Sequence, residues 1–170
     1  IGVGLVGSEM CIRDRGGSSE PLTQENREEF SFYAKKHIES IKANNSKAAL
    51  YMTHAFVEPH KDFEINQISI IEDIYTKVGK ENNVLVIPVG LAFDIAYKEI
   101  PEIKLHHNDG THPNLKGTYL AACTVFASIY GESPIGLKYD YYGAINKEDK
   151  KLLQEIAHKA TLKYLKRTIN

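Results

Sequence analysis

The chain has 170 residues, of which 42% are hydrophobic and 25% are charged, and its formal net charge is −1. These values are typical of one globular domain and exclude an intrinsically disordered chain. Positive and negative charges alternate along the chain, which argues against nucleic-acid binding because that needs a basic face. No apolar run approaches the roughly 18 residues of a membrane span, and two cysteines imply no disulfide framework.

The N-terminal segment, residues 1–15, is expected not to belong to the native fold. Its stretch 5–15 resembles the translation of a transposase adapter used in preparing DNA sequencing libraries. A signal peptide is the alternative, but the apolar run over 1–6 is too short, no basic region precedes it, and charged residues follow at once. We therefore exclude this segment, together with Ser8 and Cys11, and expect native sequence from about Gly16.

Three elements are predicted in the next part of the chain. Thr23 is a candidate N-cap for a helix over residues 23–44, whose apolar positions recur at helical spacing. These positions are Phe30, Tyr33, Ala34, Ile38 and Ile41. Residues 48–53 form a short apolar run that predicts a buried strand. After a loop over 54–62, a second helix is expected over 63–78, ending at Gly79. Its expected buried face is Ile65, Ile68, Ile71, Tyr75 and Val78.

The second half of the chain continues the alternation. Residues 84–89 predict a strand with Pro88 at its end, where a missing N–H donor is tolerated, and a short helix over 91–97 follows. A polar loop over 99–113 leads to a helix that runs to about Tyr130, and a last helix covers 147–165. The expected inward residues of these two helices are Leu115, Tyr119, Ala122, Phe126 and Ile129, then Leu152, Ile156, Ala160 and Tyr164.

Alternating helices and strands predict an α/β fold, in which a parallel sheet carries helices on both faces. Ligands in such folds bind beyond the carboxyl ends of the strands, which here are the loop over 53–62 and the segment after Val89. Two strands are too few for a stable sheet, so we expect further strands from sequence upstream of this chain.

The loop segment over residues 106–113, which reads HHNDGTHP, holds the candidate catalytic pair. A serine hydrolase needs an imidazole that takes the hydroxyl proton and a carboxylate that holds this imidazole in the right tautomer. Asp109 and His112 lie three residues apart, and Gly110 permits the tight turn that brings the carboxylate to one ring nitrogen. Pro113 is expected to fix the start of the next helix, which leaves the other ring nitrogen of His112 to face the cleft.

An Asp-x-x-His-Pro segment of this kind resembles the last sequence block of the SGNH/GDSL hydrolase family. The flanking segments are similar to those of one bacterial subgroup of the family, and the resemblance extends over nearly all of residues 16–165. These segments are 50–53 (LYMT), 88–93 (PVGLAF), 117–123 (GTYLAAC) and 131–137 (GESPIGL). The resemblance implies a flavodoxin-like three-layer α/β/α fold, of which residues 16–170 are the C-terminal portion of a single domain.

The same resemblance implies hydrolysis of a small-molecule or carbohydrate ester through an acyl-enzyme, with no cofactor or metal. Acetyl esters of carbohydrates are one candidate substrate. His112 would act as general base and then general acid, and Asp109 would orient it. The family's nucleophilic serine lies in an N-terminal Gly-Asp-Ser-like block, and a glycine and an asparagine or glutamine complete its oxyanion hole. This sequence contains neither that block nor a Gly-x-Asn-Asp block, so we expect the nucleophile upstream and this chain alone to be inactive.

Residues 16–19 are expected to be the tail of the loop that carries the amide-bearing residue of the oxyanion hole. A non-catalytic binding or structural module of the same fold is the alternative to an esterase. The two readings differ in whether the upstream sequence contains a Gly-Asp/Asn-Ser block.

His54 and Thr111 are the candidate substrate-binding residues, although a solvated loop position is favoured for His54. A metal site built from the histidine cluster and Asp109 is a further alternative. Adjacent side chains diverge, however, and no HExxH-type helical spacing is present. We therefore expect His106 and His107 at the loop surface.

Two further features have structural interpretations. The tyrosine-rich run over residues 139–142 suggests a sugar-binding platform, but packing of this loop against the body of the domain is favoured. Cys123 lies among apolar helical residues and is interpreted as inert core. Ser18 and Ser19 lack the strand-turn-helix context of a nucleophile and are not candidates.

Overall fold

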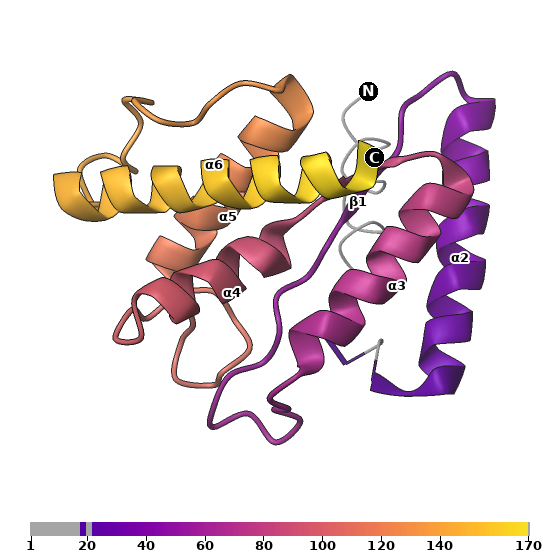
Figure 1. Ribbon diagram of the computed structural model, residues 1–170, viewed down its shortest axis with the longest axis horizontal. Helices are drawn as coiled ribbons and strands as arrows, with labels where there is room; N and C mark the ends of the chain where they lie inside the picture. Colours follow the sequence, from indigo (N-terminus) through magenta and orange to yellow (C-terminus); the bar gives the residue numbers. More distant parts are fainter. Residues whose placement is uncertain (1–17, 20–21, 170) are drawn as a thin grey trace.

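The computed structural model describes residues 18–19 and 22–169, so the adapter-like segment expected over 1–15 lies outside the described part of the chain. The elements are α2 (Gln24–Ala43), β1 (Ala49–Tyr51), α3 (Gln67–Asn82), β2 (Leu85–Ile87), α4 (Val89–Glu99), α5 (Leu115–Tyr130) and α6 (Lys147–Ile169). In Figure 1, α2 and α3 lie side by side, while α4, α5 and α6 gather at the other end of the molecule. The predicted α/β class is confirmed. None of the described helices is long and apolar enough to span a membrane.

The two described strands, β1 and β2, pair in parallel, with Ala49 opposite Leu85, and α3 forms the crossover between them. Both strands have three residues and are shorter than predicted. Pro88 is the N-cap of α4 rather than the end of a strand. At the carboxyl edge of the pair, the N–H of Gly90 donates to the carbonyl of Met52. The first turn of α4 is therefore tied to the residue that follows β1.

The boundaries of α2 follow the prediction, but one of its predicted buried residues is exposed. Thr23 Oγ1 accepts a hydrogen bond from the N–H of Asn26, as an N-cap does. Ile38 is buried, whereas Tyr33 is 45% exposed.

The prediction for α3 is wrong at both ends. The helix begins at Gln67 rather than at residue 63, and Ile65 lies exposed in the preceding loop. It ends at Asn82, and the C-cap residue Asn83 adopts the left-handed conformation with φ 48°. Gly79 lies inside the helix, where an added Cβ would come within 2.3 Å of Val86 Cγ2. The glycine therefore allows α3 to approach β2 closely and does not end the helix.

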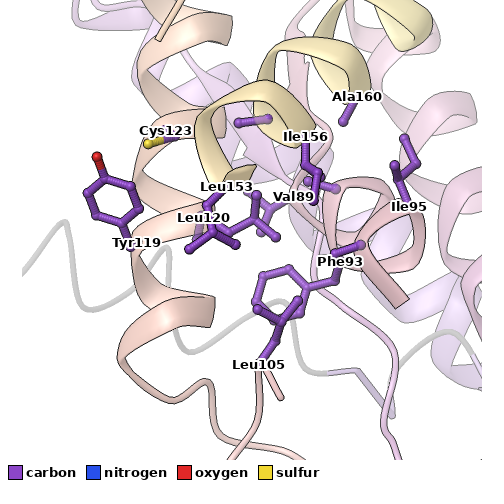
Figure 2. Close-up of a cluster of buried hydrophobic side chains, with 14 of the residues drawn as sticks. Val89, Phe93, Ile95, Leu105, Tyr119, Leu120, Cys123, Leu153, Ile156 and Ala160 are labelled. Carbon is purple, nitrogen blue, oxygen red and sulfur yellow. The ribbon is translucent and has the colours of Figure 1, made fainter. Parts of the chain in front are cut away.

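Two apolar clusters pack against the strand pair. The first joins α4, α5 and α6 around Phe93, Leu120 and Leu153, as Figure 2 shows, and it includes Ile87. The second joins α2 and α3 to the strands and includes Val86. Neighbouring strand residues point to opposite faces, so Ile87 and Val86 bring β2 into both clusters.

The predicted buried stripe of α5 is wrong in part, because α6 packs along this helix. Ala122 and Ile129 are exposed, while Leu120 and Thr124 are buried. Cys123 is buried as expected, and burial raises the pKa of its thiol to about 11. A thiol with this pKa stays protonated and unreactive near neutral pH.

Of the residues predicted to face inward from α6, Ile156, Ala160 and Tyr164 are buried and Leu152 is half-buried.

The backbone of the tyrosine loop contacts the body of the domain, since the Tyr139 carbonyl accepts from the Tyr119 hydroxyl, but the tyrosine side chains do not pack there as favoured. The exposed fractions of Tyr139, Tyr141 and Tyr142 are 56%, 50% and 93%. Their rings instead lie edge to face with one another, with centroids 6.0–6.2 Å apart.

Candidate active site

The chain segment that carries the predicted catalytic pair is a closed loop between α4 and α5. An isolated antiparallel bridge joins His106 to Pro113, and the N–H of His107 donates to the carbonyl of His112 at 2.8 Å. Asn114 closes the base of this loop: its Oδ1 caps the first turn of α5, and its Nδ2 donates to the His106 carbonyl. The predicted role of Pro113 is therefore wrong, because the side-chain cap at Asn114 sets the start of the helix.

The expected hydrogen bond between Asp109 and His112 is present. Asp109 Oδ2 lies 2.8 Å from His112 Nδ1, and Asp109 Oδ1 accepts the backbone N–H groups of Thr111 and His112 at 2.9 Å each. Both side chains reach solvent, with exposed fractions of 76% for His112 and 47% for Asp109. No hydrogen bond of His112 Nε2 is present among the described residues.

The charge state of Asp109 sets the tautomer of His112. Backbone hydrogen bonds from His112 and Thr111, then the side-chain bond from His112, hold the pKa of Asp109 well below its usual range. An ionised carboxylate only accepts hydrogen bonds, so His112 Nδ1 carries the proton. In the neutral imidazole, Nε2 then keeps its lone pair and is available as a base.

The loop lies at the carboxyl edge of the strands, as expected. The N–H of Val57, in the segment after β1, donates to the Gly110 carbonyl at 2.9 Å. Gly110 has φ +73°, and an added Cβ would lie 2.1 Å from the Val57 carbonyl oxygen. Only glycine fits both the backbone angle and this close approach.

The expectation that His106 lies at the loop surface is wrong. Its side chain is buried, as is that of His54, and His106 Nε2 lies 3.0 Å from His54 Nδ1. On its other side, His106 Nδ1 lies 2.6 Å from the hydroxyl of Tyr97. Both histidine rings also contact the ring of Phe93. The solvated position considered for His54 is therefore wrong as well.

His54 is held in place by the segment around it. The hydroxyl of Ser18 donates to the His54 carbonyl, consistent with its exclusion as a nucleophile. Gln67, which is fully buried, accepts from the N–H of Phe56 and donates to the Ser18 carbonyl. The first turn of α3 therefore secures both Ser18 and the segment that follows β1.

Burial governs the titration of the two histidines. It lowers the pKa of His106 to about 4, to which repulsion from His54 adds while the charge of Asp109 opposes. The pKa of His54 is also lowered, mainly by burial, while a hydrogen bond to the Ala55 carbonyl opposes the shift and the charge of His112 adds to it. Both rings are therefore neutral at pH 7.

We expect the free energy of unfolding to fall as the pH falls from about 6.5 to 4. An unfolded histidine has a pKa of about 6.5, so in this window the unfolded chain binds more protons than the folded chain and stability rises with pH. His106 contributes at most about 3 kcal/mol to this change. Urea unfolding of the chain and of His106→Gln at several pH values measures it. Carboxyl groups contribute equally to both proteins, so parallel pH curves for the two would contradict the assignment.

The other predicted site residues have simpler surroundings. Thr111 is half-buried beside His112, and its N–H supports the Asp109 carboxylate. His107 is exposed, as predicted. Within residues 18–19 and 22–169, no group of three or more His, Cys, Asp or Glu side chains is arranged to hold a metal ion.

Sequence reasoning missed Tyr97. It lies near the end of α4, nine residues before His106, and belongs to no motif. The signal available was a tyrosine shortly before a histidine-rich loop, which alone says nothing about contact.

Comparisons with known proteins extend the fold assignment. No family model and no curated protein matches the sequence. Among solved structures, the fold is similar to that of a DUF4886 family protein from Bacteroides uniformis, with a TM-score of 0.73 and 20% sequence identity. The similarity covers 85% of this chain and 59% of that protein, so the chain spans about three fifths of its length. The fold is thus a helix-rich α/β arrangement that a longer protein shares.

Proposed function

We propose that this chain is part of a serine hydrolase of the SGNH type that cleaves carboxylic esters. The observation that carries the proposal is the Asp109–His112 pair, hydrogen-bonded at 2.8 Å at the carboxyl edge of the parallel strands. Ligands of α/β folds bind at this edge. An exposed histidine whose Nδ1 is hydrogen-bonded to a carboxylate is the arrangement that a serine nucleophile requires.

In the proposed reaction, a serine from outside the described residues attacks the ester carbonyl carbon. His112 Nε2 takes the hydroxyl proton as the new C–O bond forms, and the imidazolium is stabilised by Asp109. His112 then gives this proton to the departing alkoxide. Water attacks the acyl-enzyme in the second half, again with His112 as base and then acid. No cofactor takes part in this sequence.

The finer fold assignment belongs to the same proposal. The complete domain would be a flavodoxin-like three-layer fold. Sequence that precedes residue 16 would supply its remaining strands and the nucleophile block. Two observations support this. The similar DUF4886 protein is longer than this chain, and Ser18, the first described residue, donates a hydrogen bond to the His54 carbonyl beside the candidate site.

The substrate class proposed is a small-molecule or carbohydrate ester, with carbohydrate acetyl esters as the specific candidate. His54 and Thr111 are the proposed substrate-binding residues. His54 lies in the segment after β1, and Thr111 lies in the loop that docks on this segment at the strand ends. Thr111 also directly precedes the proposed base, His112.

The test compares the complete polypeptide, including the sequence upstream of residue 16, with the 170-residue chain. We expect the complete polypeptide to hydrolyse p-nitrophenyl acetate and to be labelled on an upstream serine by a fluorophosphonate. The 170-residue chain should show neither activity above free imidazole nor labelling. If the complete polypeptide is neither active nor labelled, the esterase proposal fails and a non-catalytic module of this fold takes its place.

A further inference from the structure

Three polar side chains form a continuous hydrogen-bonded chain behind the candidate site. Tyr97 on α4 contacts His106 in the loop over residues 106–113, which carries the proposed catalytic pair and is called the catalytic loop below. His106 contacts His54 in the segment after β1, and the two distances are 2.6 and 3.0 Å. Elements far apart in the sequence therefore share one network. Because a neutral imidazole has one donor and one acceptor nitrogen, the direction of any one bond determines the direction of the whole chain.

The Tyr97 hydroxyl sets that direction. Its oxygen accepts the N–H of Leu105 at 3.3 Å, which leaves the hydroxyl proton to be donated to His106 Nδ1. The length of 2.6 Å agrees with this, because O–H donors form bonds of about 2.5–3.0 Å and N–H donors about 2.7–3.2 Å. The reverse direction would leave the Tyr97 hydroxyl proton with no acceptor among these three hydrogen-bonded side chains.

The remaining protons follow in order. His106 accepts at Nδ1, so its single proton lies on Nε2 and is donated to His54 Nδ1. His54 in turn carries its proton on Nε2. The Ala55 carbonyl, 3.3 Å from His54 Nδ1, would favour the opposite tautomer, but it offers a longer contact than His106 does. No hydrogen bond of His54 Nε2 is present among the described residues.

We propose that the Tyr97–His106–His54 chain holds His54 as a neutral Nε2–H donor for an oxygen of the ester substrate, with Tyr97 and His106 as positioning residues. This inference rests on the proposed function, since it names a substrate contact at the same site. His54 follows β1 at the edge where the catalytic loop docks.

The neutral state of His54 suits this task. The titratable groups facing the two buried rings are Tyr97, Asp109 and His112. Burial lowers the pKa of His54, and the charge of His112 lowers it further. A charged His54 would repel the imidazolium that forms on His112 during the reaction. A neutral donor contributes a hydrogen bond without that repulsion and without competing for the nucleophile's proton.

The first arm of the test needs no enzymatic activity. Long-range ¹H–¹⁵N correlation spectra of the ¹⁵N-labelled complete polypeptide at pH 7 report which ring nitrogen of each histidine carries the proton. We expect the Nε2–H form for His54 and His106. Tyr97→Phe keeps the aromatic ring and removes the hydroxyl, so both residues should lose their single tautomer. An Nδ1–H form of His54, or tautomers unchanged in Tyr97→Phe, overturns the inference.

The second arm uses the complete polypeptide and p-nitrophenyl acetate. His54→Leu should lower kcat/KM by ~10²-fold, the usual loss when one donor to a developing oxyanion is removed, and His54→Gln, whose amide N–H donates, should recover part of it. If hydrolysis depends on His112 but neither His54 variant changes it, the inference fails and the proposed function stands. If no hydrolysis depends on His112, the proposed function fails. The inference that His54 donates to an oxygen of the ester substrate then fails as well.

Discussion

Replacing His112 by alanine in the complete polypeptide is expected to lower kcat/KM for p-nitrophenyl acetate by about 10²–10⁴-fold, the usual contribution of a positioned general base. This corresponds to about 3–5 kcal/mol of transition-state stabilisation. His112 is the only imidazole of the catalytic loop that is both hydrogen-bonded to a carboxylate and exposed, and the variant removes it. Because its side chain is 76% exposed, its removal leaves no buried cavity and the fold should be unaffected.

Two variants of the same loop sharpen this result. Asp109→Asn can still accept backbone N–H bonds, but its amide donates to His112 Nδ1 and forces the proton onto Nε2, so activity should fall by ~10³–10⁴-fold. His107→Ala removes an exposed imidazole from the same loop and should leave kcat/KM unchanged. Equal losses in His107→Ala and His112→Ala would mean that the loop, rather than the base, had been disturbed.

Replacing Gly110 by alanine is expected to lower the free energy of unfolding by about 2–5 kcal/mol. Two costs combine: a positive φ of +73° costs an L-residue about 1–2 kcal/mol, and overpacking adds about 1–3 kcal/mol. The second cost arises because the new Cβ would lie 2.1 Å from the Val57 carbonyl oxygen and 3.0 Å from the His60 nitrogen. These are backbone atoms, so the catalytic loop must move away from the segment after β1.

Gly131→Ala separates the two costs. Gly131 caps α5 with φ +68°, and an added Cβ there would meet nothing within 4 Å, so only the strain of about 1–2 kcal/mol applies. Urea unfolding of both variants gives the difference that belongs to the close contact. Amide exchange at Val57, which donates to the Gly110 carbonyl, should accelerate only in Gly110→Ala. Equal destabilisation and equal exchange in both variants would show that the loop does not dock on the β1 segment.

The features that the sequence by itself determined depend on residues close together in the chain. Thr23 caps α2 because its hydroxyl reaches an N–H three residues later. Asp109 and His112 meet for the same reason, since a turn at Gly110 joins them. The order of helices and strands also follows from local periodicity. Such contacts need no knowledge of what lies across the domain.

Tertiary structure alone decided which side chains are buried and therefore which groups can act. Gly79 and Ile65 have the residue types of a helix end and a core position, yet β2 packs against the first and the second is 86% exposed. His106 and His107 are identical neighbours in a polar loop, but only His106 lies between Tyr97 and His54. Those partners are 9 and 52 residues away in sequence. The free energy of burying a polar group depends on whether it finds a hydrogen-bond partner in the interior. The fold brings that partner from distant parts of the chain.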